Sequence, residues 1–234
     1  MASQAHEGGL DPFVMSEFPS DATEAWVADL KRFRAGVSRF MLSYQFGIDE
    51  VMTKVEILKK EFEHLHAYSP IEHVNSRLKT PESILDKVRR DGHALSFDTI
   101  REQVQDIAGV RITCSFISDT YRVADMLSSQ ADVTVIKVKD YIAEPKPNGY
   151  KSLHLIITIP IFLSTGVEEV PVEIQIRTIA RDFWASLEHK IYYKFQKDVP
   201  DDLLGELREA ADVANRLDLK MERIHDEVHR GQTW

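Results

Sequence analysis

Apolar residues recur at helical spacing in the first part of the chain. They fall three or four residues apart from Asp21, a possible N-cap, to about Ser43, and again from about Asp49 to His66. Such stripes are typical of amphipathic helices, so two helices are predicted here. Residues 1–20 mix glycine, serine, proline and acids without any period, which predicts a mobile tail.

The middle of the chain alternates between helical and strand patterns. Segment 71–78 is short and mixed in pattern, and no element is assigned to it. Thr80-Pro81 has the form of a helix start with proline in the first turn, and this helix is predicted to continue to Arg90. The elements predicted after it are a helix over 98–105, a strand over 108–117, a helix over 118–129 and a strand over 133–139.

The last part begins with a loop over 140–149, which contains two prolines and an Asn-Gly pair. The elements predicted after it are strands over 153–161 and 169–177, joined by a turn at 164–166, and helices over 178–195 and 201–230. The pattern therefore predicts an α/β (α+β) fold. It would have a mixed sheet of four to five strands flanked by helices, with helical extensions at both ends.

Composition limits the class of protein. The chain has 234 residues, of which 43% are hydrophobic and 29% charged, which suits one globular domain, or a domain with helical additions. No apolar run approaches the roughly 20 residues needed to span a bilayer, and the N-terminus lacks a signal-peptide pattern, so a soluble cytoplasmic protein is expected. The single cysteine, Cys114, lies in an apolar run and is expected to be a small core residue.

Charge is unevenly distributed along the chain. The formal net charge of −9 argues against general binding to DNA or other nucleic-acid backbones, because neutralising phosphates requires an excess of Lys and Arg. Segments 77–90 and 137–151 are nevertheless net basic. They could line a pocket for a highly phosphorylated small molecule, or they could be two solvated faces.

Two carboxylates stand at positions suited to phosphoryl transfer, which needs acids to hold Mg²⁺ and cations to neutralise phosphates. Asp106 stands just before a predicted strand, and Glu173 lies within the apolar strand VPVEIQI. A carboxylate in such a strand is costly unless it is paired or binds a metal. The alternative for Glu173 is an ion pair with Arg111 or Arg177.

A tyrosine among lysines is the second chemical feature. Tyr150 follows an Asn-Gly pair and is flanked by Lys146 and Lys151, so an exposed ring could stack on a base while the lysines contact phosphates. A core tyrosine is the alternative, and His154 in the strand SLHLII is by itself typical of a core histidine. The glycine patterns of phosphate-binding loops are absent, so side chains would have to hold ATP.

Four segments together resemble a known family. They are HVNSRLKTPESILDKVRR, DIAGVRITCSF, KVKDYIAEPKPNGYKSLH and EIQIRTIARDFWASLEHKIYYK, in this order over roughly residues 70–197. They resemble the synthetase domain of the RelA/SpoT homologue family, and the length resembles its small alarmone synthetases. The resemblance implies a nucleotidyltransferase-like fold and Mg²⁺-dependent transfer of pyrophosphate from ATP to the 3′-OH of GDP or GTP, which makes (p)ppGpp. The expected parts are a tail (1–20), N-terminal helices (21–68), a synthetase domain (69–197) and a C-terminal helix (198–234).

The resemblance also implies roles for individual residues on the donor side. Asp106 would be a Mg²⁺ ligand, and Glu173 would bind or orient that metal and activate the 3′-OH. Arg111 would help Arg77 to sandwich adenine, which suits the stacking of guanidinium planes on aromatic rings. The implied ATP contacts are Arg77, Lys79, Ser83, Lys87, Arg90 and Arg111.

On the acceptor side, the resemblance implies that Tyr150 stacks on guanine. The other implied contacts to GDP or GTP are Lys139, Lys146, Asn148, Lys151, His154, Gln175 and Arg177. Lys139 lies in a loop, 137–140, that looks like the family's basic form, which is associated with a preference for GDP.

Partners and rival functions follow from the same resemblance. Some small members are tetramers, assembled partly through terminal helices, and some bind single-stranded RNA, so a homo-oligomer is expected and RNA is a possible partner. An apolar stripe in the last helix could serve an interface or the monomer core. No hydrolase activity is expected. The rivals are a non-catalytic nucleotide-binding or RNA-binding module, disfavoured by the Asp106 and Glu173 pair, and a pyrophosphokinase with another acceptor, disfavoured by the intact KPNGYKSLH segment.

Overall fold

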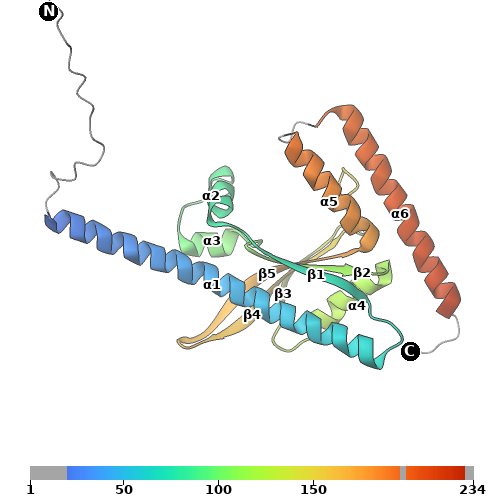
Figure 1. Ribbon diagram of the computed structural model, residues 1–234, viewed down its shortest axis with the longest axis horizontal. Helices are drawn as coiled ribbons and strands as arrows, with labels where there is room; N and C mark the ends of the chain where they lie inside the picture. The colour runs from blue at the N-terminus through green and yellow to red at the C-terminus, as the bar shows by residue number, and fades with distance from the viewer. Residues whose placement is uncertain (1–19, 196–198, 230–234) are drawn as a thin grey trace, which may run out of the picture. The chain divides into compact units, whose positions relative to one another are not determined.

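The computed structural model describes residues 20–195 and 199–229 (Figure 1). The predicted tail lies outside these residues, apart from Ser20. The elements in chain order are α1 (Ser20–Leu65), β1 (Ile71–Leu78), α2 (Pro81–Arg90), α3 (Phe97–Gln103), β2 (Ala108–Cys114), α4 (Ile117–Ser128), β3 (Thr134–Asp140), β4 (Leu153–Leu163), β5 (Gly166–Thr178), α5 (Ile179–Lys194) and α6 (Asp201–His229). The chain divides within α1 into two compact units, one up to Met41 and one from Leu42. The sheet and the site lie in the second unit.

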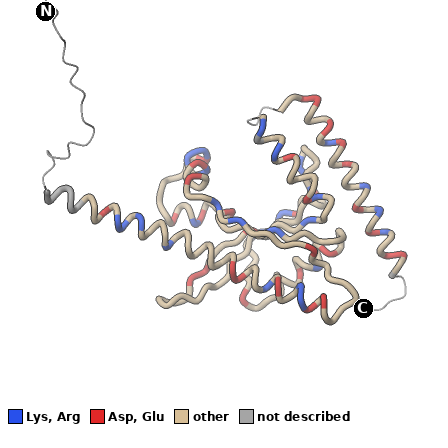
Figure 2. Tube along the Cα trace, in the orientation of Figure 1, with Lys and Arg blue, Asp and Glu red and all other residues tan. Residues whose placement is uncertain are grey.

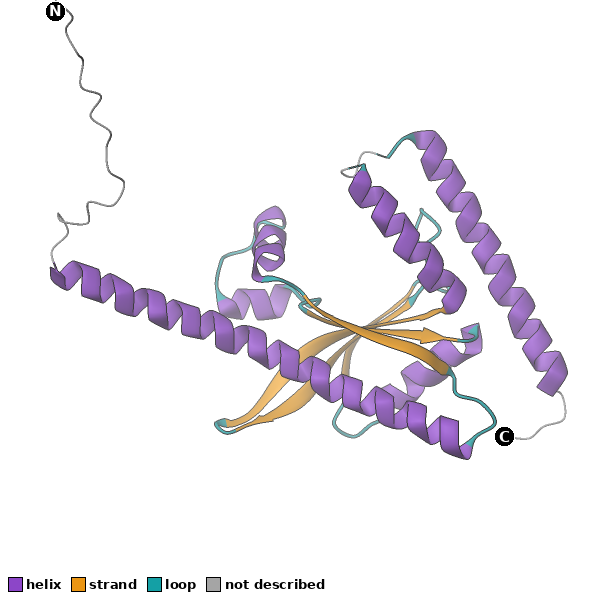
Figure 3. Cartoon of the chain, in the orientation of Figure 1, coloured by secondary structure: helices purple, strands orange, loops and turns teal. Residues whose placement is uncertain are grey.

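The second unit is built on a five-stranded mixed sheet (Figure 3). The strand order is β1-β2-β5-β4-β3, with β2 and β5 parallel and the other neighbours antiparallel. The predicted sheet of four to five strands is confirmed. The strand that the sequence pattern did not assign is β1, which lies at one edge and shows little alternation because most of its side chains are not buried.

The two faces of the sheet differ in chemistry because side chains alternate along each strand. On β5, Val172, Ile174 and Ile176 are fully buried on one face, whereas the intervening Glu173, Gln175 and Arg177 point to the other. Helices α4 and α5 lie on opposite sides of the sheet (Figure 3). The alternation thus produces an apolar face and a polar face.

The two predicted N-terminal helices are one continuous helix, α1, so that prediction is wrong. Within the second unit the helix has buried residues at Tyr44, Ile48, Val51 and Val55, so the apolar stripe continues through the segment expected to be a break. Gly47 lies in this segment because the helix approaches β5 closely there. A Cβ on Gly47 would lie 2.9 Å from Cγ1 of Val170.

Strand β2 is shorter than predicted because α4 begins earlier. The predicted strand ran to residue 117, but β2 ends at Cys114 and α4 starts at Ile117. Carboxylates fix this start: Asp119 accepts a hydrogen bond from the Phe116 backbone N–H, and Glu222 of α6 accepts one from the N–H of Ile117. Such groups satisfy the free N–H groups of a helix start. Cys114 is buried, as expected. No helix in the described part of the chain is long and apolar enough to cross a membrane.

Candidate active site

A polar cavity of about 290 Å³ opens on the polar face of the sheet. Strand register explains its composition, because Arg77, Gly109 and Glu173 form one row across β1, β2 and β5, and Asn75, Arg111 and Gln175 form the next. Gly109 has no side chain, so the middle of the first row stays open. The lining residues are Asn75, Ser76, Arg77, Lys79, Asp106, Gly109, Val110, Arg111, Glu173 and Gln175.

One end of the cavity holds a carboxylate between two lysines. The Asp106 carboxylate accepts hydrogen bonds from Nζ of Lys79 at 2.5 Å and from Nζ of Lys87 at 2.8 Å. Lys79 follows β1, and Lys87 lies on α2, whose start is capped by the side chain of Thr80. Burial alone would raise the pKa of Asp106, but the two lysines outweigh burial and lower it. Asp106 is therefore ionised at neutral pH and brings two cations to the cavity.

Glu173 is held at both of its carboxylate oxygens. His154 Nδ1 lies 3.1 Å from Oε1, and Gln175 Nε2 donates to Oε2 at 2.9 Å. Burial would raise the pKa of Glu173, but these hydrogen bonds lower it below its ordinary value. The alternative ion pair with Arg111 or Arg177 is not formed, because both arginines pair instead with Asp182. The result is an ionised carboxylate in a set orientation.

Tyr150 connects to Glu173 through His154. The Tyr150 hydroxyl lies 2.8 Å from His154 Nε2. Because an ionised carboxylate can only accept, His154 Nδ1 must donate to Glu173, and in the neutral ring Nε2 then accepts from Tyr150. His154 is 6% exposed. It is thus a buried histidine, as its strand suggested, but one that faces the candidate catalytic carboxylate.

Tyr150 is partly buried, so it lies between the two alternatives of an exposed ring and a core tyrosine. The Tyr150 ring packs against Trp184, Ala185 and Ala211 of α5 and α6, and burial raises the pKa of its hydroxyl. The Lys146 ammonium lies 4.9 Å from the centre of the ring. The backbone before the ring turns at Gly149, where φ is 85°. The ring therefore has one packed side, and the Lys146 ammonium lies close to it.

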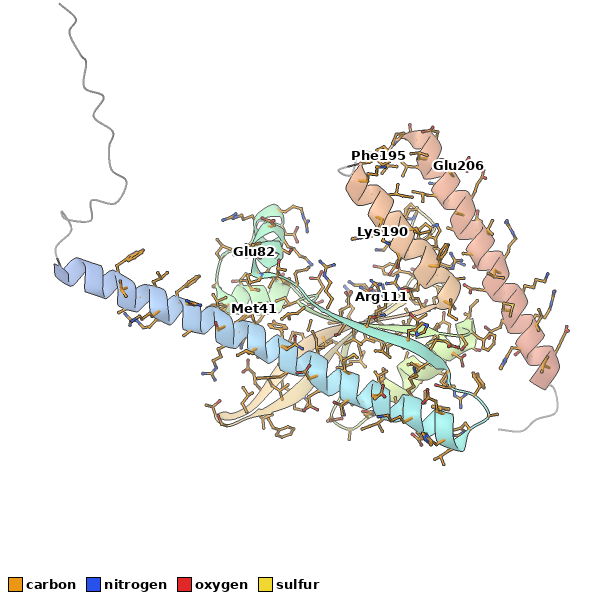
Figure 4. All side chains as sticks on the ribbon, in the orientation of Figure 1. Met41, Glu82, Arg111, Lys190, Phe195 and Glu206 are labelled. Atoms are coloured by element: carbon orange, nitrogen blue, oxygen red, sulfur yellow. The ribbon has the colours of Figure 1, made fainter. Side chains whose placement is uncertain are left out.

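Arg111 and Arg177 approach one carboxylate from adjacent strands. Nη1 of Arg111 lies 3.5 Å from Oδ1 of Asp182, and Nη1 of Arg177 lies 3.6 Å from the same oxygen. Arg177 also donates to Gln175 at 2.9 Å, and its guanidinium lies 5.8 Å from the centre of the Tyr150 ring. Figure 4 labels Arg111 on the side of the sheet where α5 lies. Asp182, in the first turn of α5, closes this end of the polar face.

The structure brings most of the predicted site residues together. Lys139 lies opposite His154 in the β3–β4 register, and so continues the row of Arg111 and Gln175. Asn148 donates to Glu188 of α5 at 3.2 Å, beside Tyr150. Figure 2 shows the accompanying charge distribution, with Lys and Arg on α2 and over the sheet, and mixed charges along α6.

Three predicted residues point elsewhere. Lys151 donates to Asn215 of α6 at 2.7 Å and, together with Arg177, lines a separate cavity of about 220 Å³. The Ser83 hydroxyl accepts a hydrogen bond from Thr80, within the cap of α2, and Arg90 pairs with its neighbour Asp91 on an exposed surface. The hydrogen bonds and the ion pair of these side chains are local. The predicted site residues that line the 290 Å³ cavity itself are Arg77, Lys79, Asp106, Arg111, Glu173 and Gln175.

Sequence reasoning missed Gly109, Tyr141 and Asp182, and also the cavity-lining residues Asn75, Ser76 and Val110. Gly109 carries no chemical group, and its importance follows only from its register with Arg77 and Glu173. Tyr141 packs edge-on against the Tyr150 and His154 rings; its position in the basic segment 137–151 was the available signal. Asp182 is an ordinary acid in the first turn of a predicted helix, and nothing in its sequence context connects it to two arginines.

Comparison with known proteins identifies relatives of this chain. The family described as "Region found in RelA / SpoT proteins" matches residues 76–198. The chain is 50% identical over 208 residues to GTP pyrophosphokinase YwaC of Bacillus subtilis (strain 168), covering 89% of this chain and 99% of that protein.

Two solved structures of a relative carry nucleotides. The small alarmone synthetase 1 from Bacillus subtilis bound to its product pppGpp is 40% identical with a TM-score of 0.78, and the match covers 83% of this chain and 98% of that chain. The same relative bound to AMPCPP is 36% identical with a TM-score of 0.73, and the match covers 84% of this chain and 100% of that chain.

Proposed function

The chain belongs to the RelA/SpoT family and is a GTP pyrophosphokinase, and we propose that it makes (p)ppGpp in the polar cavity between β1, β2 and β5. ATP is the donor, and GDP or GTP is the acceptor. The observation that carries this assignment is the convergence of two carboxylates from separate elements, Asp106 and Glu173, on one cavity. Pyrophosphoryl transfer needs such groups beside cations, whereas a module that only binds nucleotides does not.

The donor nucleotide is assigned to the side of the cavity that contains Arg77 and Arg111. A relative binds the ATP analogue AMPCPP, and the two guanidinium groups line the cavity from β1 and β2. Planar guanidinium groups stack well on adenine. Lys79 and Lys87 would then release the Asp106 carboxylate and bind phosphate oxygens instead. Ser83 and Arg90, which lie on α2 with Lys87, would contact the phosphates from farther out.

The acceptor is assigned to the side that contains Tyr150. A relative binds pppGpp, and the Tyr150 ring lies close to Lys146 and Arg177. Guanine would stack on the ring while cations contact the phosphates. The remaining proposed contacts are Lys139, Asn148, Lys151, His154 and Gln175, although Lys151 would have to leave Asn215.

Asp106 and Glu173 are also the proposed ligands of Mg²⁺. Both are ionised oxygen donors at one cavity, and among the described residues no group of three or more His, Cys, Asp or Glu could hold a metal by itself. The two carboxylates fit an ion that is held together with waters and substrate phosphates. When bound, Mg²⁺ would neutralise the phosphate oxygens and polarise the reacting phosphorus.

In the proposed reaction the 3′-oxygen of the acceptor attacks the β-phosphorus of ATP. The bond between that phosphorus and the α,β-bridging oxygen breaks, AMP leaves, and Glu173 accepts the proton of the 3′-OH. His154 and Gln175 hold both oxygens of Glu173, so the direction of the carboxylate is set before the substrate arrives. Such preorganisation lowers the barrier because no reorientation is needed during the reaction.

The assignment is tested by incubating the pure protein with ATP, Mg²⁺ and either GDP or GTP, and separating the nucleotides by anion exchange. Equal amounts of AMP and ppGpp or pppGpp are expected, and neither should form with Asp106→Ala. Full activity of Asp106→Ala would refute the site. A product formed only with a different acceptor nucleotide would refute the proposed acceptor.

We further propose that copies of the chain associate through α5 and α6, with a tetramer as the favoured assembly. An apolar groove of about 1410 Å³ runs along these helices. Its walls include Phe183, Val213 and Leu217, which are 68%, 55% and 51% exposed. In the apolar stripe of α6, Leu203 and Leu207 are partly buried, whereas Val213, Leu217 and Met221 are exposed. Large exposed apolar patches are typical of interfaces.

A further inference from the structure

The carboxylate of Asp182 lies between two arginines that belong to different substrates in the proposed function. Arg111 stands on the donor side, beside Arg77, and Arg177 stands on the acceptor side, beside Tyr150. Both guanidinium groups approach the same oxygen, Oδ1, at 3.5 Å and 3.6 Å. Asp182 is the shared contact between the two halves of the site.

Neither contact is a well-formed hydrogen bond. Oδ1 of Asp182 is inaccessible to solvent and has no hydrogen-bond partner among the described residues, and the same is true of Nε of both Arg111 and Arg177. A buried carboxylate oxygen in this position is poorly satisfied, and it gains from moving fully toward either arginine. A small shift of one arginine therefore changes the hydrogen bond that Asp182 can form with the other arginine.

The two arginines differ in freedom. The Arg177 side chain is 3% exposed and also donates to Gln175, whereas that of Arg111 is 41% exposed. Burial lowers the pKa of Arg177, and the positive charge of Arg111 acts in the same direction. The two guanidinium groups therefore repel each other, and Asp182 reduces that repulsion. A base that stacks on Arg111 would therefore fix the more exposed of the two arginines.

We infer that Asp182 is a positioning residue that couples the donor and acceptor nucleotide sites. Binding of ATP fixes Arg111, which fixes Asp182, which in turn fixes Arg177 beside the Tyr150 ring. The second nucleotide then binds to a site that is already ordered and binds more tightly, whichever nucleotide comes first, because coupling between two sites is reciprocal. This inference rests on the proposed function, since that function assigns the two arginines to different nucleotides.

Calorimetric titration can measure the coupling directly. The dissociation constant of GDP is measured with and without saturating AMPCPP, which has a methylene group in place of the oxygen whose bond must break. The wild-type chain is expected to bind GDP at least about fivefold more tightly with AMPCPP present. In Asp182→Asn, which removes the charge and keeps the shape, this ratio is expected to fall close to one while both nucleotides still bind.

The control is Glu206→Gln, which removes one acidic charge from α6, away from the site (Figure 4). It should keep the wild-type ratio. Asp182→Glu is the second variant, to be used if Asp182→Asn does not unfold cooperatively, and it should also change the ratio because its carboxylate is displaced by one methylene group.

Three outcomes would overturn the inference. They are a wild-type ratio of one, an unchanged ratio in the Asp182 variants, and a loss of both affinities by equal factors, which would indicate a merely structural role. Failure of the proposed function would look different, because the wild-type chain would then bind neither nucleotide or form no product.

Discussion

At the residue scale, the catalytic proposal depends on how Glu173 is held. His154 and Gln175 each engage one carboxylate oxygen, and the strand places the group on the polar face while Ile174 and Val172 bury the other face. The proposed chemistry thus depends on the negative charge of Glu173, whereas the packing of the strand depends mainly on the size and shape of the side chain.

Glu173→Gln separates these two requirements. We expect turnover to fall by about a thousandfold or more, because the negative charge that serves the acceptor hydroxyl is lost. The thermal unfolding curve, followed by circular dichroism, should shift only modestly to lower temperature, because the amide fills the same space but cannot accept the hydrogen bonds of both His154 and Gln175. Glu206→Gln is the matched control for charge. Turnover near the wild-type rate would refute the catalytic role of Glu173.

Substitutions at Gly109 test whether the cavity itself binds the substrate. An added Cβ would have no closer neighbour than the backbone oxygen of Arg77 at 3.5 Å, so Gly109→Ala should be tolerated. Gly109→Val would fill space between Arg77 and Glu173, and we expect the KM for ATP to rise at least about tenfold, as for a lost binding contact of 1.4 kcal/mol. An unchanged KM for ATP in a folded Gly109→Val variant would place the donor elsewhere.

At the element scale, helix α1 shows how one glycine sets a helix against a sheet. Gly47 lies within 3.3 Å of the side chains of Val170 and Val172, measured from an added Cβ. Gly205 also lies within a helix, α6, but an added Cβ there meets nothing within 4 Å. Both glycines destabilise a helix to the same intrinsic extent, but Gly47 is closely surrounded by side chains and Gly205 has free space around it.

Opposite effects on stability are therefore expected. Gly47→Leu should lower the free energy of unfolding by about 1–3 kcal/mol through overpacking, whereas Gly205→Ala should raise it by about 0.5–1 kcal/mol through helix propensity. Urea unfolding at one fixed protein concentration measures both. A stabilising Gly47→Leu would show that α1 does not pack on β5 as described.

Most elements follow from the sequence pattern, and the exceptions have physical causes. The helices and strands from Thr80 onward were predicted close to their observed bounds, because caps, prolines and periodicity mark them locally. The edge strand β1 was missed because an edge strand with few buried side chains has weak alternation. The false break in α1 arose because the stripe passes through a glycine that has a packing role.

At the scale of the whole molecule, the apolar surface of α5 and α6 predicts self-association. Light scattering behind size exclusion should give four times the chain mass of 26.8 kDa for the favoured tetramer. Leu217→Glu should shift the protein to the monomer, because it places a charge in an apolar interface. Val167→Glu, at a position of similar exposure near the β4–β5 turn, is the control and should leave the mass unchanged. A monomeric wild-type chain would refute the interface.

The sequence by itself determined the family and the reaction, because motifs such as KPNGYKSLH and EIQIRT are short continuous stretches of the chain. The tertiary structure decided which side chains share a cavity. Asp106 and Glu173 are 67 positions apart in the numbering, and only strand register and helix packing bring them to one cavity and set Lys151 aside. The role of Asp182 also came from the structure alone, because a contact shared by two arginines is a property of distances in space and not of order along the chain.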